Sequence, residues 1–308
     1  MKYDFKQVWQ IKKPQYDYLG NRITSGLQYT IQLKTGEVIA SKSLKDAKHK
    51  DDTEFIDFDD KGNLMWAFIV KNGGHGGSFW YDEYEELFYT QVTDDQGQHY
   101  FGRLNLVKGV NKEYELGDFI QPLTKIPSYL RFNFQNRQVN KAYDWVASDV
   151  KGNLYLGLRS DLYKGNFKPL KTFNLNDCQL TPTLKDASDG TTNTIQANAL
   201  AYPYVFITSG DENNKDPRLI TCIHAETGQV IFQDQLTLTS DIKLPKHKLN
   251  GSFRFEPEGV YWNLADQSLM VGFNRSQASF ISSLFGYACR SALYETKKYN
   301  RYLPALIN

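Results

Sequence analysis

The sequence contains little cysteine, methionine or proline, and it has no long apolar run. Only 3 Cys, 3 Met and 10 Pro occur in 308 residues. Cys178, Cys222 and Cys289 are odd in number, far apart in the sequence and without CxxC spacing, so neither a zinc site nor a disulfide framework is predicted. One disulfide between two of them is the alternative. No stretch approaches the roughly 18 apolar residues of a membrane span, and none is expected.

An excess of charge is also missing. The chain has 36 Lys plus Arg and 35 Asp plus Glu, a formal net charge of +1. This balance argues against a nucleic-acid or anionic-membrane partner held by bulk electrostatics. The first ten residues carry charges where a signal peptide needs an apolar core, so no standard export signal is expected. A ligand should be mostly neutral or recognised locally.

Aromatic residues are abundant, with 20 Tyr, 19 Phe and 5 Trp. Short apolar and aromatic runs alternate with turn residues along the whole chain, and no amphipathic helical period is sustained. This pattern is typical of an all-β protein. Surplus tyrosines could also serve as platforms on which sugars stack.

A short internal repeat suggests radial symmetry. Lys-Gly-Asn-Leu occurs at 61–64 and again at 151–154, each time after an aspartate and before an apolar strand. Similar groupings elsewhere predict five sheet units at about 27–70, 75–125, 140–178, 194–235 and 255–298. Units of about fifty residues predict one five-bladed β-propeller domain over 1–308, with a pair of β-sandwiches as the competing fold.

The most unusual stretch is Asn72 to Tyr81, in which four glycines bracket His75 and lead into an aromatic strand. Glycine permits a positive φ and a close backbone approach, so this run predicts a tight turn that presents one imidazole. A purely structural hairpin, with the histidine bonded to a carbonyl, is the alternative.

The first strand of each propeller unit lines the central channel, so polar residues that open the units should face one pore or its mouth. Together with the aromatic residues beside His75 they form the predicted ligand-binding set: His75, Trp80, Tyr81, Asp144, Gln196, Glu256 and Glu258. Trp145 and Trp262 are expected to pack between units instead. The remaining histidines, at 49, 99, 224 and 247, are predicted at the surface, and 42–52 and 181–194 are predicted as solvated loops.

An enzymatic alternative uses the acidic pair. Glu256 and Glu258 share one side of a regular strand, and with His75 they could form a glycosidase-like or metal site. Pro257 between them interrupts strand pairing, and a structural role is simpler. No phosphate loop, serine elbow or HExxH motif is present. The protein is therefore predicted not to be an enzyme and to use no cofactor or metal.

The chain resembles the helveticin J family of bacteriocin-like proteins of lactic acid bacteria and, more distantly, the propellers of teichoic-acid biosynthesis protein C-like and phage receptor-binding proteins. The resemblance rests on an ordered set of short motifs: Gly26-Leu27-Gln28, Gly73-Gly74-His75, Pro127-Ser128-Tyr129-Leu130, Thr194-Ile195-Gln196, Glu256-Pro257-Glu258-Gly259-Val260 and Leu293-Tyr294-Glu295. Relatives often carry an acid where this chain has Phe79-Trp80-Tyr81, so no acid is expected to contribute there.

The resemblance implies a five-bladed propeller that is secreted or associated with the cell surface. It also implies binding of a bacterial cell-wall polysaccharide, a teichoic acid or a host glycan, either in killing related bacteria or in adhesion. A hydrolase of wall polymers and a purely structural aggregation protein remain the rival functions.

Overall fold

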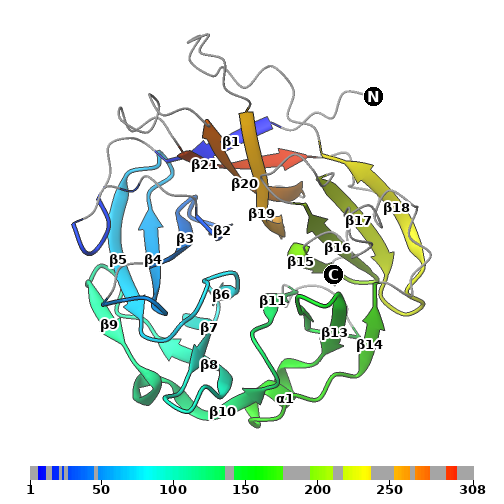
Figure 1. Cartoon of the computed structure of the whole chain (residues 1–308), viewed down its shortest axis with the longest axis horizontal. Coiled ribbons are helices and arrows are strands. Elements are labelled where there is room, and N and C mark those ends of the chain that lie inside the picture. The colour runs from blue at the N-terminus through cyan, green and yellow to red at the C-terminus, as the bar shows by residue number, and fades with distance from the viewer. Residues whose placement is uncertain are drawn as a thin grey trace.

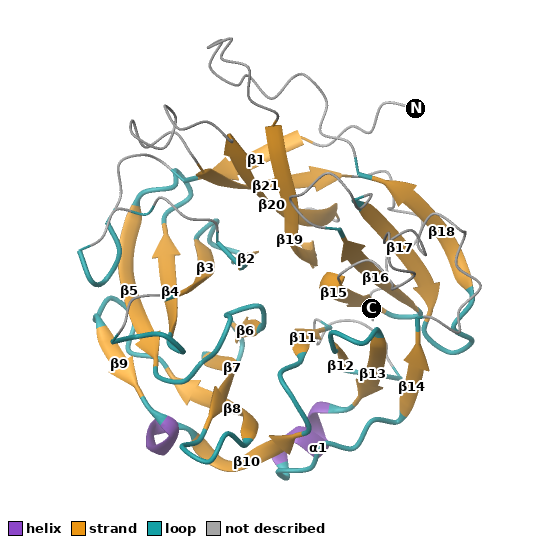
Figure 2. Cartoon of the chain, viewed as in Figure 1, coloured by secondary structure: helices purple, strands orange, loops and turns teal. Residues whose placement is uncertain are grey.

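The computed structural model describes residues 6–11, 16–20, 23, 27–44, 48–135, 142–175, 195–210, 218–236, 253–263, 268–277 and 289–296. Its strands form a ring of twisted sheets around a centre (Figure 1). The helical elements described are one short α-helix, α1 (Arg159–Tyr163), and one 3₁₀ turn, η1 (Leu116–Asp118), as Figure 2 shows. The predicted all-β class and propeller architecture are confirmed.

Five sheets account for the described strands. The first contains β2 (Tyr29–Gln32), β3 (Val38–Ser43), β4 (Thr53–Phe58), β5 (Leu64–Val70) and β9 (Lys112–Tyr114). The second contains β6 (Phe79–Asp82), β7 (Leu87–Thr93), β8 (His99–Asn105) and β10 (Ile120–Ile126). The third contains β11 (Arg131–Phe134), β12 (Trp145–Ser148), β13 (Asn153–Gly157) and β14 (Lys171–Asn174).

The fourth sheet contains β15 (Ile195–Ala201), β16 (Tyr204–Ser209), β17 (Leu219–His224) and β18 (Val230–Gln235). The fifth contains β19 (Phe253–Asn263), β20 (Ser268–Gln277), β21 (Cys289–Thr296) and β1 (Lys6–Gln10). Strand β1 pairs antiparallel with β21, so the two ends of the chain share one sheet. This strand was not predicted from the sequence, because only two of its five residues, Val8 and Trp9, are apolar.

The inner strands β2, β6, β11, β15 and β19 surround the centre of the ring (Figure 1). Contacts between them fix their directions. Ser78, before β6, accepts a hydrogen bond from the Phe132 amide at 2.7 Å, whereas Arg159 joins Asp82, at the end of β6, to the carbonyl of Gln135, just after β11. Strands β6 and β11 therefore run the same way.

Strands β2 and β19 also run in parallel. The ring of Tyr29, at the start of β2, lies where a Cβ on Gly259 would touch it, and the Gln32 amide donates to the Tyr261 hydroxyl at 2.8 Å. The ring thus has a strand-start face, where the inner strands begin, and a strand-end face, where they end.

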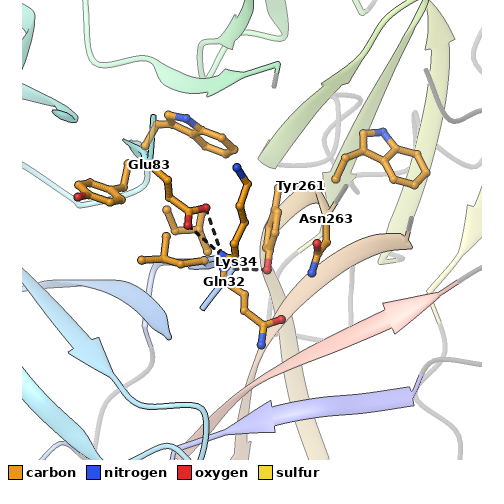
Figure 3. A pocket seen from close by; sticks show the side chains of 10 residues that line it. Gln32, Lys34, Glu83, Tyr261 and Asn263 are labelled. Atoms are coloured by element: carbon orange, nitrogen blue, oxygen red, sulfur yellow. Dashed lines mark hydrogen bonds between the residues drawn. The ribbon is translucent and has the colours of Figure 1, made fainter. Parts of the chain in front are cut away.

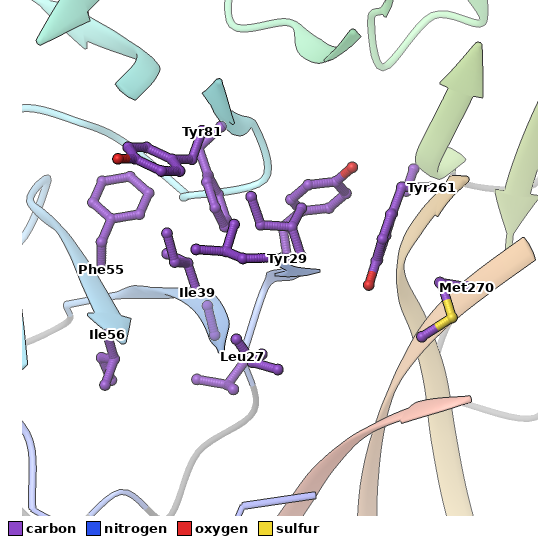
Figure 4. Close-up of a cluster of buried hydrophobic side chains, with 14 of the residues drawn as sticks. Leu27, Tyr29, Ile39, Phe55, Ile56, Tyr81, Tyr261 and Met270 are labelled. Carbon is purple, nitrogen blue, oxygen red and sulfur yellow. The ribbon is translucent and has the colours of Figure 1, made fainter. Parts of the chain in front are cut away.

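Sheets pack against sheets through aromatic side chains. Phe55 and Phe68 of the first sheet contact Phe79 and Phe88 of the second, with ring centroids 4.8 to 5.2 Å apart. Every residue of β4 is buried, because both faces of the sheet are covered. The largest apolar cluster of the described residues extends from the first sheet to Tyr261 and Met270 of the adjoining fifth sheet (Figure 4). Packing between sheets therefore accounts for part of the aromatic content.

The Lys-Gly-Asn-Leu repeat is a shared turn and not a blade period. Asp59 accepts hydrogen bonds from the amides of Lys61 and Asn63, and Asp149 does the same for Lys151 and Asn153. The first turn joins the third and fourth strands of its sheet, and the second joins the second and third strands. The two copies are thus not at equivalent positions.

Candidate functional site

A pocket opens on the strand-end face, where β2, β6 and β19 end (Figure 3). Its volume of about 50 Å³ is that of a few water molecules, so the pocket can hold the edge of a ligand but not a whole ligand molecule. The residues that line it are Ile31, Gln32, Leu33, Lys34, Trp80, Tyr81, Glu83, Tyr261, Trp262 and Asn263.

Both tryptophans of the pocket are held from behind. Trp80 packs against Phe134 of β11, with centroids 6.5 Å apart, and Trp262 meets Phe206 of β16 edge-on at 5.1 Å. Both indoles are only partly buried. Two aromatic rings that are partly accessible and fixed from behind are a feature of sites that bind flat or C–H-rich ligands, because little side-chain entropy is lost on binding.

Tyr81 is fixed in a third way. The ammonium of Lys108 lies over its ring, 4.7 Å from the centroid. Burial raises the pKa of the Tyr81 hydroxyl, and the Lys108 charge opposes that rise. The hydroxyl therefore stays protonated at neutral pH, and Tyr81 contributes an uncharged wall.

The polar side of the pocket comes from three segments. Both carboxylate oxygens of Glu83 accept the Lys34 backbone N–H, at 3.2 and 3.1 Å. The Gln32 backbone N–H donates to the Tyr261 hydroxyl. Figure 3 shows Lys34 between Glu83 and Tyr261. Gly36, with φ 88°, makes the turn that follows β2 and places Lys34 at its tip.

The glycine-rich turn before β6 lies at the strand-start face. Its backbone is bonded to neighbouring strands: Thr53 donates to the Gly74 carbonyl at 2.8 Å, and the Gly77 amide donates to the Tyr129 hydroxyl at 3.1 Å. His75 is exposed at its tip. Because β6 spans roughly 10–13 Å at 3.3 Å per residue, His75 and the pocket occupy opposite ends of that strand.

Close packing explains two of the glycines. Gly74 has φ 75°, and a Cβ on it would come within 2.7 Å of the Tyr129 ring. Gly76 has φ 77°, and a Cβ there would come within 2.9 Å of Thr53. Close packing of the backbone therefore explains why Gly74 and Gly76 are glycines. His75, between them, remains exposed at the surface.

The predicted ligand set is divided by the fold. Trp80 and Tyr81 meet in the pocket with Tyr261 and Trp262. Gln196, at the start of β15, is 7% exposed and donates to the Gly210 carbonyl at 3.0 Å. Glu258 is 8% exposed in β19, beside the register shift between Pro257 and Gly259. The side chain of Glu256 lies outside the described residues.

Asp144 does not open a unit, contrary to the prediction. It lies between β11 and β12, and its carboxylate accepts the Arg159 backbone N–H at 3.0 Å. The inner strand of the third sheet is β11, which begins at Arg131. The polar residue that this strand buries is Asn133, which is 2% exposed.

Two further predictions about surface residues are wrong. His49 is 5% exposed and pairs with Asp52 at 2.8 Å. Lys42 belongs to β3, and its ammonium lies 2.6 Å from Asp17 and 3.7 Å from Glu54. Burial raises the pKa of Glu54 to about 7, and Lys42 opposes that rise. Trp145 is fully buried, as predicted, whereas Trp262 lines the pocket.

The polar residues of the pocket were missed in the sequence. Gln32, Lys34, Glu83 and Asn263 lie at or just beyond the ends of inner strands, and they look like ordinary turn residues. Once the inner strands are known, their last residues are the signal that would find this site. Within the described ranges, no three His, Cys, Asp or Glu side chains gather in a way that could hold a metal. None of the described helices is long and apolar enough to cross a membrane.

No protein-family model and no curated protein matches the sequence. Among solved structures, the tail fiber of Staphylococcus aureus phage P68 is similar, with a TM-score of 0.62 and 13% identity over 97% of this chain and 54% of that chain. An alpha-L-arabinofuranosidase from Lactobacillus brevis has a TM-score of 0.47 and 10% identity, covering 87% of this chain and 89% of that one. The Dos1 propeller has a TM-score of 0.35 and 10% identity, covering 85% and 58%. The chain spans about half the length of the tail fiber, and identities this low show likeness of fold alone.

Proposed function

We propose that this chain binds a glycan of a bacterial surface or of mucosa, without cleaving it, through the pocket on its strand-end face. One observation carries the proposal: four aromatic side chains and four polar ones converge there from three inner strands. Aromatic faces take the C–H surfaces of a sugar, and planar polar groups take its hydroxyls. The small volume suits one edge of a sugar ring, with the remainder of the ligand lying across the partly buried rings of Trp80 and Trp262.

The wider setting is part of the same proposal. The five sheets are the five blades of one propeller domain over 1–308, and the protein acts outside the cell or at its surface. The resemblance to helveticin J proteins supports this setting through its ordered motifs. It leaves two roles, killing of related bacteria and adhesion, which a growth assay on an indicator strain separates.

The binding test uses purified Gram-positive wall polysaccharide and mucin glycans. Saturable binding without new reducing ends and without a fall in wall turbidity is expected. Product that is released by the wild type and disappears in Glu258→Gln would support the rival hydrolase, which uses Glu256 and Glu258 with His75.

Three variants locate the site. Trp80→Ala should weaken binding by about tenfold, the equivalent of roughly 1.4 kcal/mol for one lost aromatic contact. Phe167→Leu is the control for lost packing. Phe167 and Trp80 are both partly buried and pack against the same apolar cluster, but Phe167 does not line the pocket. His75→Ala tests the strand-start face. If His75→Ala removes binding and Trp80→Ala keeps it, the site lies at the glycine-rich turn instead.

A further inference from the structure

We infer that the pocket selects a neutral sugar unit with free hydroxyl groups over a phosphate- or carboxylate-bearing polymer. This inference rests on the proposed glycan binding and adds the class of glycan. It distinguishes between two ligands that the sequence analysis gave as alternatives, a neutral polysaccharide and a teichoic acid.

The first argument is the charge of the lining. Lys34 supplies one positive group and Glu83 one negative group, and the other eight lining residues are uncharged. Among the described residues, neither side chain takes part in an ion pair, so both charges remain available at the pocket. The formal charge of the whole chain is +1. Neither the pocket nor the protein as a whole therefore attracts a polyanion.

The second argument is the balance of donors and acceptors. The Lys34 ammonium can only donate hydrogen bonds, and the Glu83 carboxylate can only accept them. Each Glu83 oxygen receives the same single backbone N–H, which leaves lone pairs on both. The side-chain amide nitrogen of Gln32 donates to the Gly36 carbonyl at 3.4 Å, and its oxygen can accept a hydrogen bond. A ligand that fills the pocket must therefore both donate and accept.

Sugar hydroxyls meet this requirement, and phosphodiesters do not. A hydroxyl group can accept from Lys34 while it donates to Glu83. A phosphodiester or a carboxylate offers acceptors only, so it would satisfy Lys34 but bring a second negative charge beside Glu83. Like charges at short range cost free energy, and the Glu83 oxygens would be left without a donor.

The experiment divides wall polysaccharide into neutral and acidic fractions by anion exchange and adds poly(glycerol phosphate) as a purely phosphate probe. Binding is measured by calorimetry in about 50 mM and about 500 mM NaCl, because the higher concentration screens exposed charges. The variants are Lys34→Met and Glu83→Gln, whose amide still offers an oxygen to the Lys34 N–H. Lys71→Met and Glu113→Gln make the same charge changes in an ion pair of 3.3 Å on the first sheet that does not line the pocket.

The inference predicts binding of the neutral fraction that changes less than twofold between the two salt concentrations. It also predicts that Lys34→Met and Glu83→Gln each weaken that binding about tenfold, as expected for loss of one hydrogen bond to a charged group. The two control variants should bind as the wild type does.

A different pattern would overturn the inference and leave the proposed function standing. In that pattern the acidic fraction and poly(glycerol phosphate) bind, and salt weakens their binding. Lys34→Met also weakens their binding, and Glu83→Gln strengthens it. If neither fraction binds the wild type, the proposed function itself fails.

Discussion

The side-chain amide of Asn133 donates a hydrogen bond to the hydroxyl of Tyr29 over 2.5 Å, although the two residues belong to the third and first sheets. The Tyr29 hydroxyl in turn donates to the Val260 carbonyl of the fifth sheet at 3.3 Å. These three inner strands are thus linked at the centre of the ring by polar groups that are shielded from water.

Asn133→Ala should destabilise the protein by about 1–3 kcal/mol, because it leaves the buried Tyr29 hydroxyl without its donor. Chemical denaturation of the single and double variants measures this. Tyr29→Phe combined with Asn133→Ala should cost less than the sum of the two single changes, since both remove the same interaction. Strict additivity would show that the bond does not link the sheets energetically.

Gly74→Ala should destabilise the protein more than Gly97→Ala. Both glycines have φ near 75–78°, so both substitutions incur about 1–2 kcal/mol of left-handed strain. Only at Gly74 would the new Cβ meet a neighbour, the Tyr129 ring at 2.7 Å, whereas a Cβ at Gly97 meets nothing within 4 Å. Equal losses in thermal denaturation would mean that the glycine-rich turn does not need its close packing.

Asp57 should make stability depend on pH. Burial, and then the charge of Glu37, raise the pKa of this carboxyl from 3.8 to about 7, against the hydrogen bond from Trp66. The folded protein therefore holds the proton more tightly than the unfolded chain does. The stabilisation is complete below pH 3.8 and is lost as the pH rises to about 7.

Asp57→Asn keeps an acceptor for Trp66 and removes the titration. The melting temperature of the variant minus that of the wild type should increase as the pH rises through this window. A difference that is constant with pH would show that Asp57 does not titrate as its burial requires. Glu54, whose pKa is also raised, still contributes its own pH dependence to both proteins.

The sequence predicted the class of fold because its signals are local. Apolar runs, glycine turns and aspartate-capped hairpins each act within a few residues, and enough of them occur to indicate a ring of sheets. The same locality explains the misplaced repeat, because the turns at Asp59 and Asp149 have identical bonds in different hairpins. The residues of a turn therefore do not indicate which two strands of a sheet the turn connects.

The site could be predicted only in part, because its halves meet through long-range packing. Trp80 and Tyr81 can be predicted because they are aromatic residues that directly follow an unusual turn. Lys34 and Glu83 are 49 positions apart and resemble ordinary turn residues until β2 and β6 lie side by side. The direction of the inner strands also separates His75 from the pocket, and no pattern within one strand reveals that separation.

Fluorine NMR of the protein labelled with 5-fluorotryptophan tests the central claim most directly. The chain has 5 Trp, of which Trp80 and Trp262 line the pocket and Trp9, Trp66 and Trp145 are buried elsewhere. Single Trp→Phe variants assign the resonances, and the wall polysaccharide that binds best is titrated in. We expect the Trp80 and Trp262 resonances to shift together in a saturable way while the other three stay in place. Saturable binding that leaves Trp80 and Trp262 unmoved would contradict a glycan site on the strand-end face.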